Sequence, residues 1–313
     1  MRMLFCCCIG IITFCNFSFG QAQLDSFYVQ STFHTPTVGL QTTYKHFSLS
    51  FSGAAAAVRP MVLQNRNLSL GIRVKYKNIG FALALPVTSY NSSGFSTPNA
   101  FGFAIQLLPA QYFLQANFQY IKGFEDLSVL RTQSDAVFQP ERKMIYGEFI
   151  GNYVFNHKKF SLRSALKMIN IQKRSAGSWL VSVPVNYQYF TTDGLSVAAK
   201  DESDEQVDLY RSFRIGVGGG YAYTQVVGSW SATVLMTGGM EFRSWKFRDL
   251  TSDTYNSEFL LRPRIRILSS IVYNKPSYFV GLVGRYLSGL EVADGLNVRV
   301  KDFGIRLLVG RRF

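Results

Sequence analysis

The chain has 313 residues and a formal net charge of +14; 15% of its residues are aromatic and only 17% are charged. This length suits one large β-barrel or two ordinary domains, and no shift in composition divides the chain, which favours one domain. All four cysteines, Cys6, Cys7, Cys8 and Cys15, fall near the amino terminus. Disulfides, cysteine metal sites and cysteine nucleophiles are therefore excluded from the rest of the chain.

The first twenty residues are predicted to be a cleaved secretory signal peptide. Arg2 precedes an apolar run from Cys6 to Phe17, and Ser18 and Gly20 place small residues where a signal peptidase cleaves. Residues 21–37 are polar without a clear period and are predicted to be a periplasmic lead-in. Residues 38–313 are predicted to form the barrel domain.

The basic charge first suggests nucleic acid as a partner. An exported chain rarely meets nucleic acid, so no nucleic-acid partner is expected. The expected anionic partners are outer-membrane lipid and lipopolysaccharide. After the predicted signal peptide no apolar run approaches the roughly 20 residues that a membrane helix needs. A membrane location would therefore require a closed barrel, since an open sheet leaves backbone groups unpaired in lipid.

Segments with alternating polar and apolar residues follow one another along the chain, and each is predicted to be a strand. In chain order they are 68–76, 79–87, 111–120, 144–155, 160–168, 178–190, 213–223, 230–239, 259–273, 278–287 and 302–313. Tight turns and longer Gly, Ser, Asn and Asp loops separate them alternately. This pattern predicts an all-β fold, an up-and-down antiparallel transmembrane β-barrel.

The strand number follows from counting these segments together with less regular ones, which gives about thirteen. Bacterial single-chain barrels have an even number of strands. A further strand at Leu195–Lys200, turned by Thr192-Asp193-Gly194, would raise the count to about fourteen. Twelve strands is the alternative.

The closing segment alternates most clearly. Phe303, Ile305, Leu307 and Val309 share one face, and the chain finishes on Phe313. A long strand with an aromatic carboxy-terminus resembles the closing strand of bacterial outer-membrane barrels. The resemblance implies that Phe313 is recognised by the barrel insertion machinery, and that the protein is located in the outer membrane of a Gram-negative bacterium.

Several short runs resemble an uncharacterised family of Gram-negative barrel-like proteins described only as a domain of unknown function. The runs are Gln119–Phe124, Tyr153–Asn156, Lys159–Ser161, Gln172–Ser178 and Gly218–Tyr221. Their order along the chain is the stronger part of the resemblance. It implies a barrel fold and, because the family has no assigned active residues, implies no chemistry.

Arg262, Arg264 and Arg266 alternate with apolar residues. An arginine on the lipid face near the bilayer midplane costs about 2–4 kcal/mol, so all three are predicted to face the lumen. The same parity predicts further lumen-lining basic residues, which are Arg285, Arg306, Arg163, Lys167, Arg73 and Lys75. Pro263 cannot donate to a strand ladder, so a bulge is predicted there.

Two interpretations of these basic residues are open. A basic lumen favours anions, as charged rings do in pores, and would make them an anion path. Alternatively, the arginines pair with Glu148, Asp302 and Glu241 and fill a narrow barrel.

No catalytic residue, metal site or cofactor is predicted. The three histidines, His34, His46 and His157, lie in no catalytic motif, and the acidic run 201–205 lacks the glycine and spacing of a calcium loop. The sequence predicts a non-enzymatic outer-membrane barrel of unassigned activity, porin-like, that acts as a small pore or as a structural or assembly component of the envelope. The alternatives are an outer-membrane lipid or lipopolysaccharide hydrolase and a secreted soluble β-protein that binds envelope polymers.

Overall fold

The computed structural model describes residues 24–53, 61–91, 94–96, 99–126, 137–198, 204–249, 255–293 and 296–313. The predicted signal peptide and residues 201–203 of the acidic run lie outside these ranges. Within them, no helix has the length and apolar content needed to cross a membrane.

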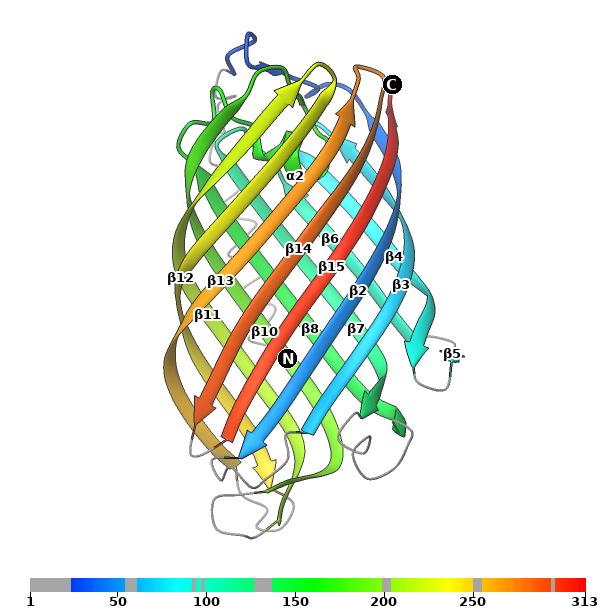
Figure 1. The fold of residues 1–313 in the computed structure, drawn as a ribbon, viewed down its shortest axis with the longest axis vertical. Coiled ribbons are helices and arrows are strands. Elements are labelled where there is room, and N and C mark those ends of the chain that lie inside the picture. Colours follow the sequence, from blue (N-terminus) through cyan, green and yellow to red (C-terminus); the bar gives the residue numbers. More distant parts are fainter. Residues whose placement is uncertain are drawn as a thin grey trace, which may run out of the picture.

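Antiparallel strands form one closed barrel (Figure 1). The sheet has 13 strands, but the short β5 (Gly94–Ser96) pairs with β4 alone, so twelve strands surround the lumen. These are β2 (Thr37–Gly53), β3 (Met61–Tyr76), β4 (Ile79–Asn91), β6 (Asn99–Leu107), β7 (Tyr112–Asp126), β8 (Val137–Val154), β10 (Ala176–Ala198), β11 (Asp204–Val227), β12 (Trp230–Asp249), β13 (Tyr255–Asn274), β14 (Tyr278–Ala293) and β15 (Leu296–Arg312). Pairing of β15 with β2 joins the two ends of the chain. The predicted up-and-down barrel is confirmed, with twelve strands, the alternative count.

The prediction of fourteen strands is wrong because Leu195 does not begin a new strand. β10 continues through Thr192-Asp193-Gly194 to Ala198, and its register against β11 shifts between Thr191 and Leu195. A bulge thus accommodates the residues that the sequence suggests as a turn.

The predicted strand at 160–168 is also wrong, because Leu162–Lys167 form the short helix α2. Ser161 caps its amino end by accepting a hydrogen bond from the Ser164 N–H, and Met168 ends it in the left-handed conformation. Leu162 and Leu166 therefore share a helix face rather than a strand face. Arg163 and Lys167 lie on this helix and not on the barrel wall.

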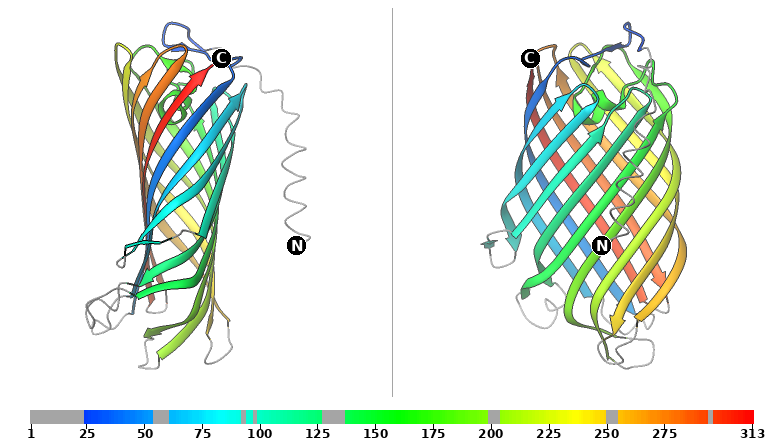
Figure 2. Two further views of the ribbon diagram at one scale, coloured as in Figure 1. Left: turned by 90° about the vertical axis from the view of Figure 1, so that its right-hand side faces the viewer. Right: turned by 180° about the vertical axis from the view of Figure 1, so that it is seen from behind.

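The two ends of the barrel differ (Figures 1 and 2). At one end, called here the turn end, lie residues 24–36, α2 and the tight turns at 77–78 and 228–229. There β1 (Val29–Gln30) pairs with β9 (Ile171–Gln172). The opposite end is called here the loop end; β2 ends there at Gly53 and β3 begins there at Met61. Residues 24–36 therefore fold against the segment that contains α2.

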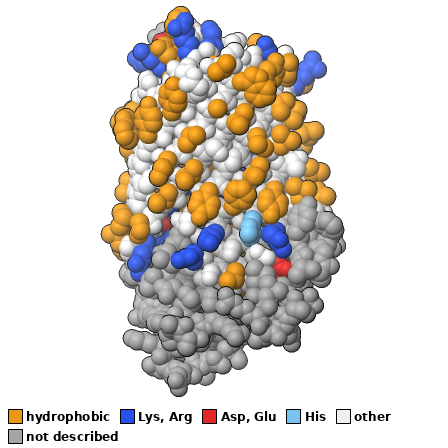
Figure 3. All heavy atoms as spheres, in the orientation of Figure 1, with side chains coloured by type: hydrophobic (Ala, Val, Ile, Leu, Met, Phe, Trp, Pro, Cys, Tyr) orange, Lys and Arg blue, Asp and Glu red, His pale blue; other side chains and the backbone are white. Residues whose placement is uncertain are grey.

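Side chains alternate between the two faces of the wall. On β15, Phe303, Ile305 and Leu307 are exposed on the outside, whereas Leu308 and Arg312 are buried inside. Figure 3 shows apolar side chains spread over the outer wall, with Lys and Arg gathered toward its two edges. The outer surface is therefore a broad apolar band.

No bulge lies at Pro263, which corrects the prediction made for this residue. Pro263 pairs with Met240 in an unbroken β12–β13 ladder. The β13–β14 ladder begins only at Ile265, which pairs with Ser288. Pro263 thus has a ladder partner on β12 and none on β14. A residue paired on one side only can lack an N–H without breaking a continuous ladder.

An apolar core fills the lumen at the turn end, and α2 is part of it. Every residue of α2 is buried. Inward-facing side chains of the wall pack around it, and the core comprises Leu108, Phe113, Val154, Phe160, Leu162, Ala165, Leu166, Met168, Ile169, Leu180, Ala222, Leu235, Leu268, Val272, Phe279, Val283 and Leu308. A Cβ atom at Gly281 would collide with Met168. This core, called here the plug, lies inside the barrel at the turn end.

Candidate functional site

The interior is strongly basic, both beside the plug and from the plug toward the loop end. Seven predicted lumen-lining residues lie on strands with inward parity: Arg262, Arg264 and Arg266 on β13, Arg285 on β14, Arg306 on β15, and Arg73 and Lys75 on β3. Arg163 and Lys167 reach the same interior from α2. The structure adds Lys45 on β2 and Arg243 on β12, which sequence reasoning missed. Lys45 alternates with Thr43 and Gln41, and that pattern was the available signal.

Three acidic side chains neutralise part of this charge. Glu148 on β8 lies 3.6 Å from Arg264 and 3.8 Å from Arg285. β10, β11 and β12 separate β8 from β13 in the sheet, so these ion pairs cross the lumen. Glu241 pairs with Arg264 at 2.5 Å and with Arg243 at 3.3 Å. Asp302 pairs with Arg285 at 2.5 Å. The acids thus hold some arginines in a network that crosses the barrel.

Other basic residues attach the plug to the wall. Arg73 donates to the Gln106 side chain at 3.2 Å and to the Lys167 carbonyl at 3.5 Å. Arg163 donates to the Leu108 carbonyl. Lys75 donates to the Thr32, Phe33 and Thr35 carbonyls of the segment before β2. Arg312 donates to the Asn274 side chain and to the Met168 carbonyl. These residues serve the architecture of the turn end.

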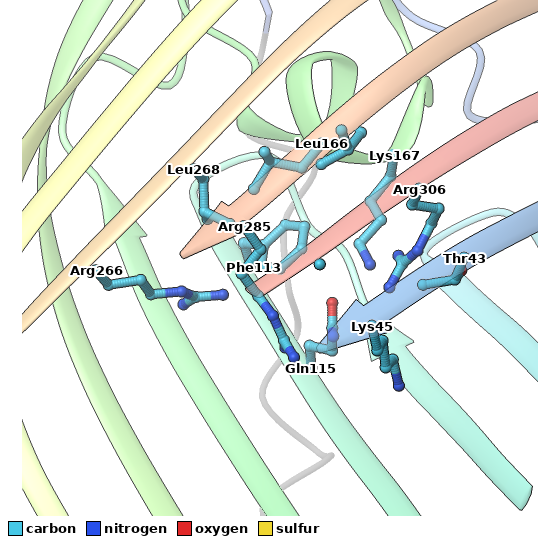
Figure 4. Close-up of a pocket in the computed structure, with 12 residues that line it drawn as sticks. Thr43, Lys45, Phe113, Gln115, Leu166, Lys167, Arg266, Leu268, Arg285 and Arg306 are labelled. Atoms are coloured by element: carbon cyan, nitrogen blue, oxygen red, sulfur yellow. The ribbon is translucent and has the colours of Figure 1, made fainter. Parts of the chain in front are cut away.

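Five basic residues, among them the paired Arg285, line a cavity of about 60 Å³ on the loop-end side of α2 (Figure 4). Its lining holds Lys45, Lys167, Arg266, Arg285 and Arg306 and, among the described residues, no acidic side chain. Figure 4 shows Lys167 pointing from α2 into the space that Arg306 and Arg285 also enter. We call this space the cationic cavity.

Among the described residues, four of its five basic side chains make no ion pair, and Lys167 Nζ lies 5.8 Å from the centre of the Phe113 ring. Within the described part of the chain, no hydrogen bond or ion pair reaches the side-chain nitrogens of Lys45, Lys167, Arg266 and Arg306. Burial, with Arg306 and Arg73 nearby, holds the pKa of Lys167 well below its usual value. Buried charges are normally paired, so an anion would satisfy these groups.

The contacts of the three histidines are local and reach no acidic side chain among the described residues. His46 Nε2 lies 3.1 Å from the Gln64 amide oxygen, and His157 Nδ1 lies 3.3 Å from the Val154 carbonyl. His34 packs its ring against Phe33. In the same ranges no three His, Cys, Asp or Glu side chains gather as metal ligands. The predicted lack of an enzymatic activity remains a prediction.

Comparison with solved structures finds outer-membrane barrels at low similarity. The outer membrane protease OmpT from Escherichia coli shares 8% identity, with a TM-score of 0.46, over 91% of this chain and 98% of that one. The TodX monoaromatic hydrocarbon channel shares 8% identity, with a TM-score of 0.33, over 95% of this chain and 100% of that one. An anion-selective porin from Comamonas acidovorans shares 9% identity, with a TM-score of 0.16, over 88% of this chain and 98% of that one. No activity carries over at this distance.

No curated protein sequence matches the chain. The family described as "Domain of unknown function (DUF4421)" matches residues 23–302, nearly the whole of the described barrel, so the resemblance seen in the short sequence runs is confirmed and the chain belongs to this family.

Proposed function

We propose that the protein spans the outer membrane of a Gram-negative bacterium as a plugged barrel and binds a small anion in its lumen. The observation that carries the proposal is the cationic cavity, in which Lys45, Lys167, Arg266 and Arg306 are enclosed with no hydrogen bond or ion pair to their side chains among the described residues. The plug argues against a permanently open pore, because the described residues pack an apolar core inside the turn end.

The membrane location is supported by the outer surface. Large apolar side chains are exposed on the wall, among them Leu40, Ile72, Val234 and Ile271. Soluble monomers rarely expose apolar patches beyond a few hundred Å², so the apolar band disfavours the soluble alternative. In a bilayer the same band would face hydrocarbon.

Aromatic pairs at the turn end support the same placement. Ring centroids lie 5.3 Å apart for Tyr112 and Tyr153 and 5.1 Å apart for Trp179 and Tyr221. Trp230 and Tyr273 form a third pair, also at 5.1 Å. Tyr and Trp are enriched at membrane–water interfaces. The turn end would then face the periplasm, and lipopolysaccharide would surround the loop end.

Inorganic phosphate is expected to stabilise the folded protein. At about 100 times its Kd, an anion that binds only the native state adds about 2.7 kcal/mol to the free energy of unfolding. The measurement is thermal unfolding in detergent micelles with phosphate, against chloride at equal ionic strength. The double variant Lys45→Gln plus Arg306→Gln should lose the phosphate effect, since it removes two unpartnered cations. Equal stabilisation of wild type and variant would refute the cationic cavity as the site.

Phe313 is proposed to act as an insertion signal and not as part of the core; its ring lies 5.3 Å from the Arg311 guanidinium. The Phe313 side chain is 67% exposed, and its backbone N–H donates to the Pro36 carbonyl. We expect Phe313→Ala to lower the yield of membrane-inserted barrel several-fold, while the free energy of unfolding of inserted protein changes by less than about 0.5 kcal/mol. Quantification of outer-membrane fractions tests this. Phe27→Ala, at another exposed ring of the turn end, is the matched control, and an equal loss of yield in it would contradict the role of Phe313.

A further inference from the structure

The barrel wall has a break between β4 and β6. Their ladder runs from the pair Ile79–Leu107 to the pair Ala84–Gly102 and ends there. β4 continues beside β3 and then pairs with β5, while β6 pairs with β7 from Asn99 onward. In the described strands, residues 85–88 of β4 and 99–101 of β6 are therefore unpaired with each other. We call this break the seam; Figure 1 shows the β4–β5 hairpin projecting beside it.

The wall is closed again beyond the seam. β3 pairs directly with β7 through Leu63–Asp126 and Gln64–Glu125. Side chains also join the two strands here. On β3, the Gln64 amide donates to Glu125 of β7 at 2.6 Å, and Arg66 pairs with the same carboxylate at 3.1 Å. The seam is thus a gap in the ladder that is bounded by paired strands, and not the frayed end of a sheet.

The sequence explains why the ladder stops. Pro86 follows the last pair by two residues and has no N–H to donate. The register against β3 shifts at the same place, because Leu68 pairs with Thr88 while Ser69 pairs with Pro86, which leaves Val87 as an extra residue. A bulge next to a proline turns β4 away from β6.

The inner rim of the seam reaches the cationic cavity. The last two inward-facing pairs of the ladder are Ala82–Ala104 and Ala84–Gly102, and all four residues are small. They line a second cavity of about 60 Å³, which also contacts Lys45, Lys167, Arg285 and Arg306. These four basic residues line both cavities, so the charged space extends to the seam.

The outer rim is apolar and aromatic. The Phe118 ring lies 5.6 Å from Phe101 and 5.3 Å from Phe103, centroid to centroid. Leu85 and Val87 on the opposite side of the seam are 55% and 54% exposed. Phe103 and Phe118 also line the second cavity. The route from the outer wall to the charges therefore passes from aromatic rings to small residues to Lys and Arg.

We propose that the seam binds a single-chain amphiphile from the surrounding bilayer, with its small anionic head group in the cationic cavity and its chain against Phe101, Phe103 and Phe118. This inference rests on the proposed membrane location and anion site. A cavity of about 60 Å³ holds roughly four to six waters. That space fits a carboxylate or a phosphate monoester and excludes a sugar head group.

Binding of dodecyl phosphate to the full-length protein in nanodiscs, measured by calorimetry, tests this proposal. Inorganic phosphate supplies the head alone, and dodecyl maltoside supplies the chain with a neutral head. Dodecyl phosphate is expected to bind at least about tenfold more tightly than inorganic phosphate, the effect of roughly two buried methylenes. Dodecyl maltoside should not compete. If dodecyl phosphate gains nothing over inorganic phosphate, the seam proposal is overturned while the anion site stands; if neither binds, both proposals fail.

Variants of the seam test the binding of the alkyl chain separately from the binding of the head group. Ala84→Trp fills the inner rim, and Phe103→Ala plus Phe118→Ala removes the aromatic rim without adding volume. Both should weaken dodecyl phosphate at least about tenfold. The double alanine variant, which fills no space in the cavity, should leave inorganic phosphate unchanged. Ala232→Trp, on the exposed outer face of β12, is the matched control and should bind both ligands normally. Unchanged dodecyl phosphate affinity in the double alanine variant, or equal loss of both ligands in it, overturns the proposal whether or not Ala84→Trp folds.

Discussion

Glu148→Gln is expected to destabilise the barrel by about 3–5 kcal/mol, the usual cost of removing one partner from a buried ion pair. The Glu148 side chain is 3% exposed, lies 3.6 Å from Arg264 and 3.8 Å from Arg285, and accepts a hydrogen bond from Asn117 at 2.9 Å. The amide keeps the shape but removes one of the few negative charges in a basic lumen. The arginines that it neutralises would then repel one another.

Denaturant unfolding in micelles, followed by tryptophan fluorescence, measures this effect. Glu141→Gln is the matched control, because Glu141 pairs with Lys122 at 3.0 Å but its side chain is 69% exposed. Exposed pairs contribute little, so the control should unfold like the wild type. Equal stability of the Glu148 and Glu141 variants would show that the charges crossing the lumen do not hold the barrel together.

The alternation of residues is the part of the fold that the sequence predicts most directly. A period of two separates Phe303 and Ile305 from Arg306 on opposite faces of β15 whatever the number of strands, because successive side chains of a strand point to opposite sides. The strand number depends instead on which turn signals become turns. Thr192-Asp193-Gly194 is compatible with a turn that ends a strand or with a bulge inside one. Because β11 pairs with β10 on both sides of these residues, they form a bulge.

The plug could not be predicted from periodicity. Leu162 and Leu166 are four residues apart and so fit both an alternating strand and a helix face. Ser161 is the helix-start signal in this stretch, and a lone serine is weak evidence. The helix is favoured only in the folded barrel. The 155–175 connection lies at the turn end, where α2 packs its apolar side chains against the apolar inner wall.

The candidate site depends on distances across the lumen, which no local pattern contains. Glu148 and Arg285 lie on strands far apart in the sheet and meet only because the closed barrel is narrow. The pairing interpretation fits part of the predicted set, because Arg264 and Arg285 pair with acids. Arg306 instead lines the cationic cavity, and the anion path stays a prediction.

The wild-type protein is expected to be silent in planar lipid bilayers. Besides the plug, a second group of buried apolar side chains lies in the lumen nearer the loop end, and its Phe124 and Phe190 rings pack edge to face at 5.0 Å. Opening the lumen should therefore require changes at both levels. A variant in which a Gly-Ser linker replaces residues 162–167 and alanine replaces Phe124 and Phe190 is expected to conduct.

The current through this variant should favour anions, because opening exposes Lys45, Arg266 and Arg306 to the aqueous path. Adding Arg266→Glu and Arg306→Glu should reverse the preference, which reversal potentials in a salt gradient measure. Linker replacement alone is the control and should stay silent, since the aromatic pair remains. Steady current through the wild type would contradict the plug, and cation selectivity in the opened variant would show that these basic residues do not set the charge of the path. The wild-type recording tests whether packed apolar side chains exclude water from the lumen. The reversal potential of the opened variant tests whether the basic side chains between the two apolar levels select the ion that enters.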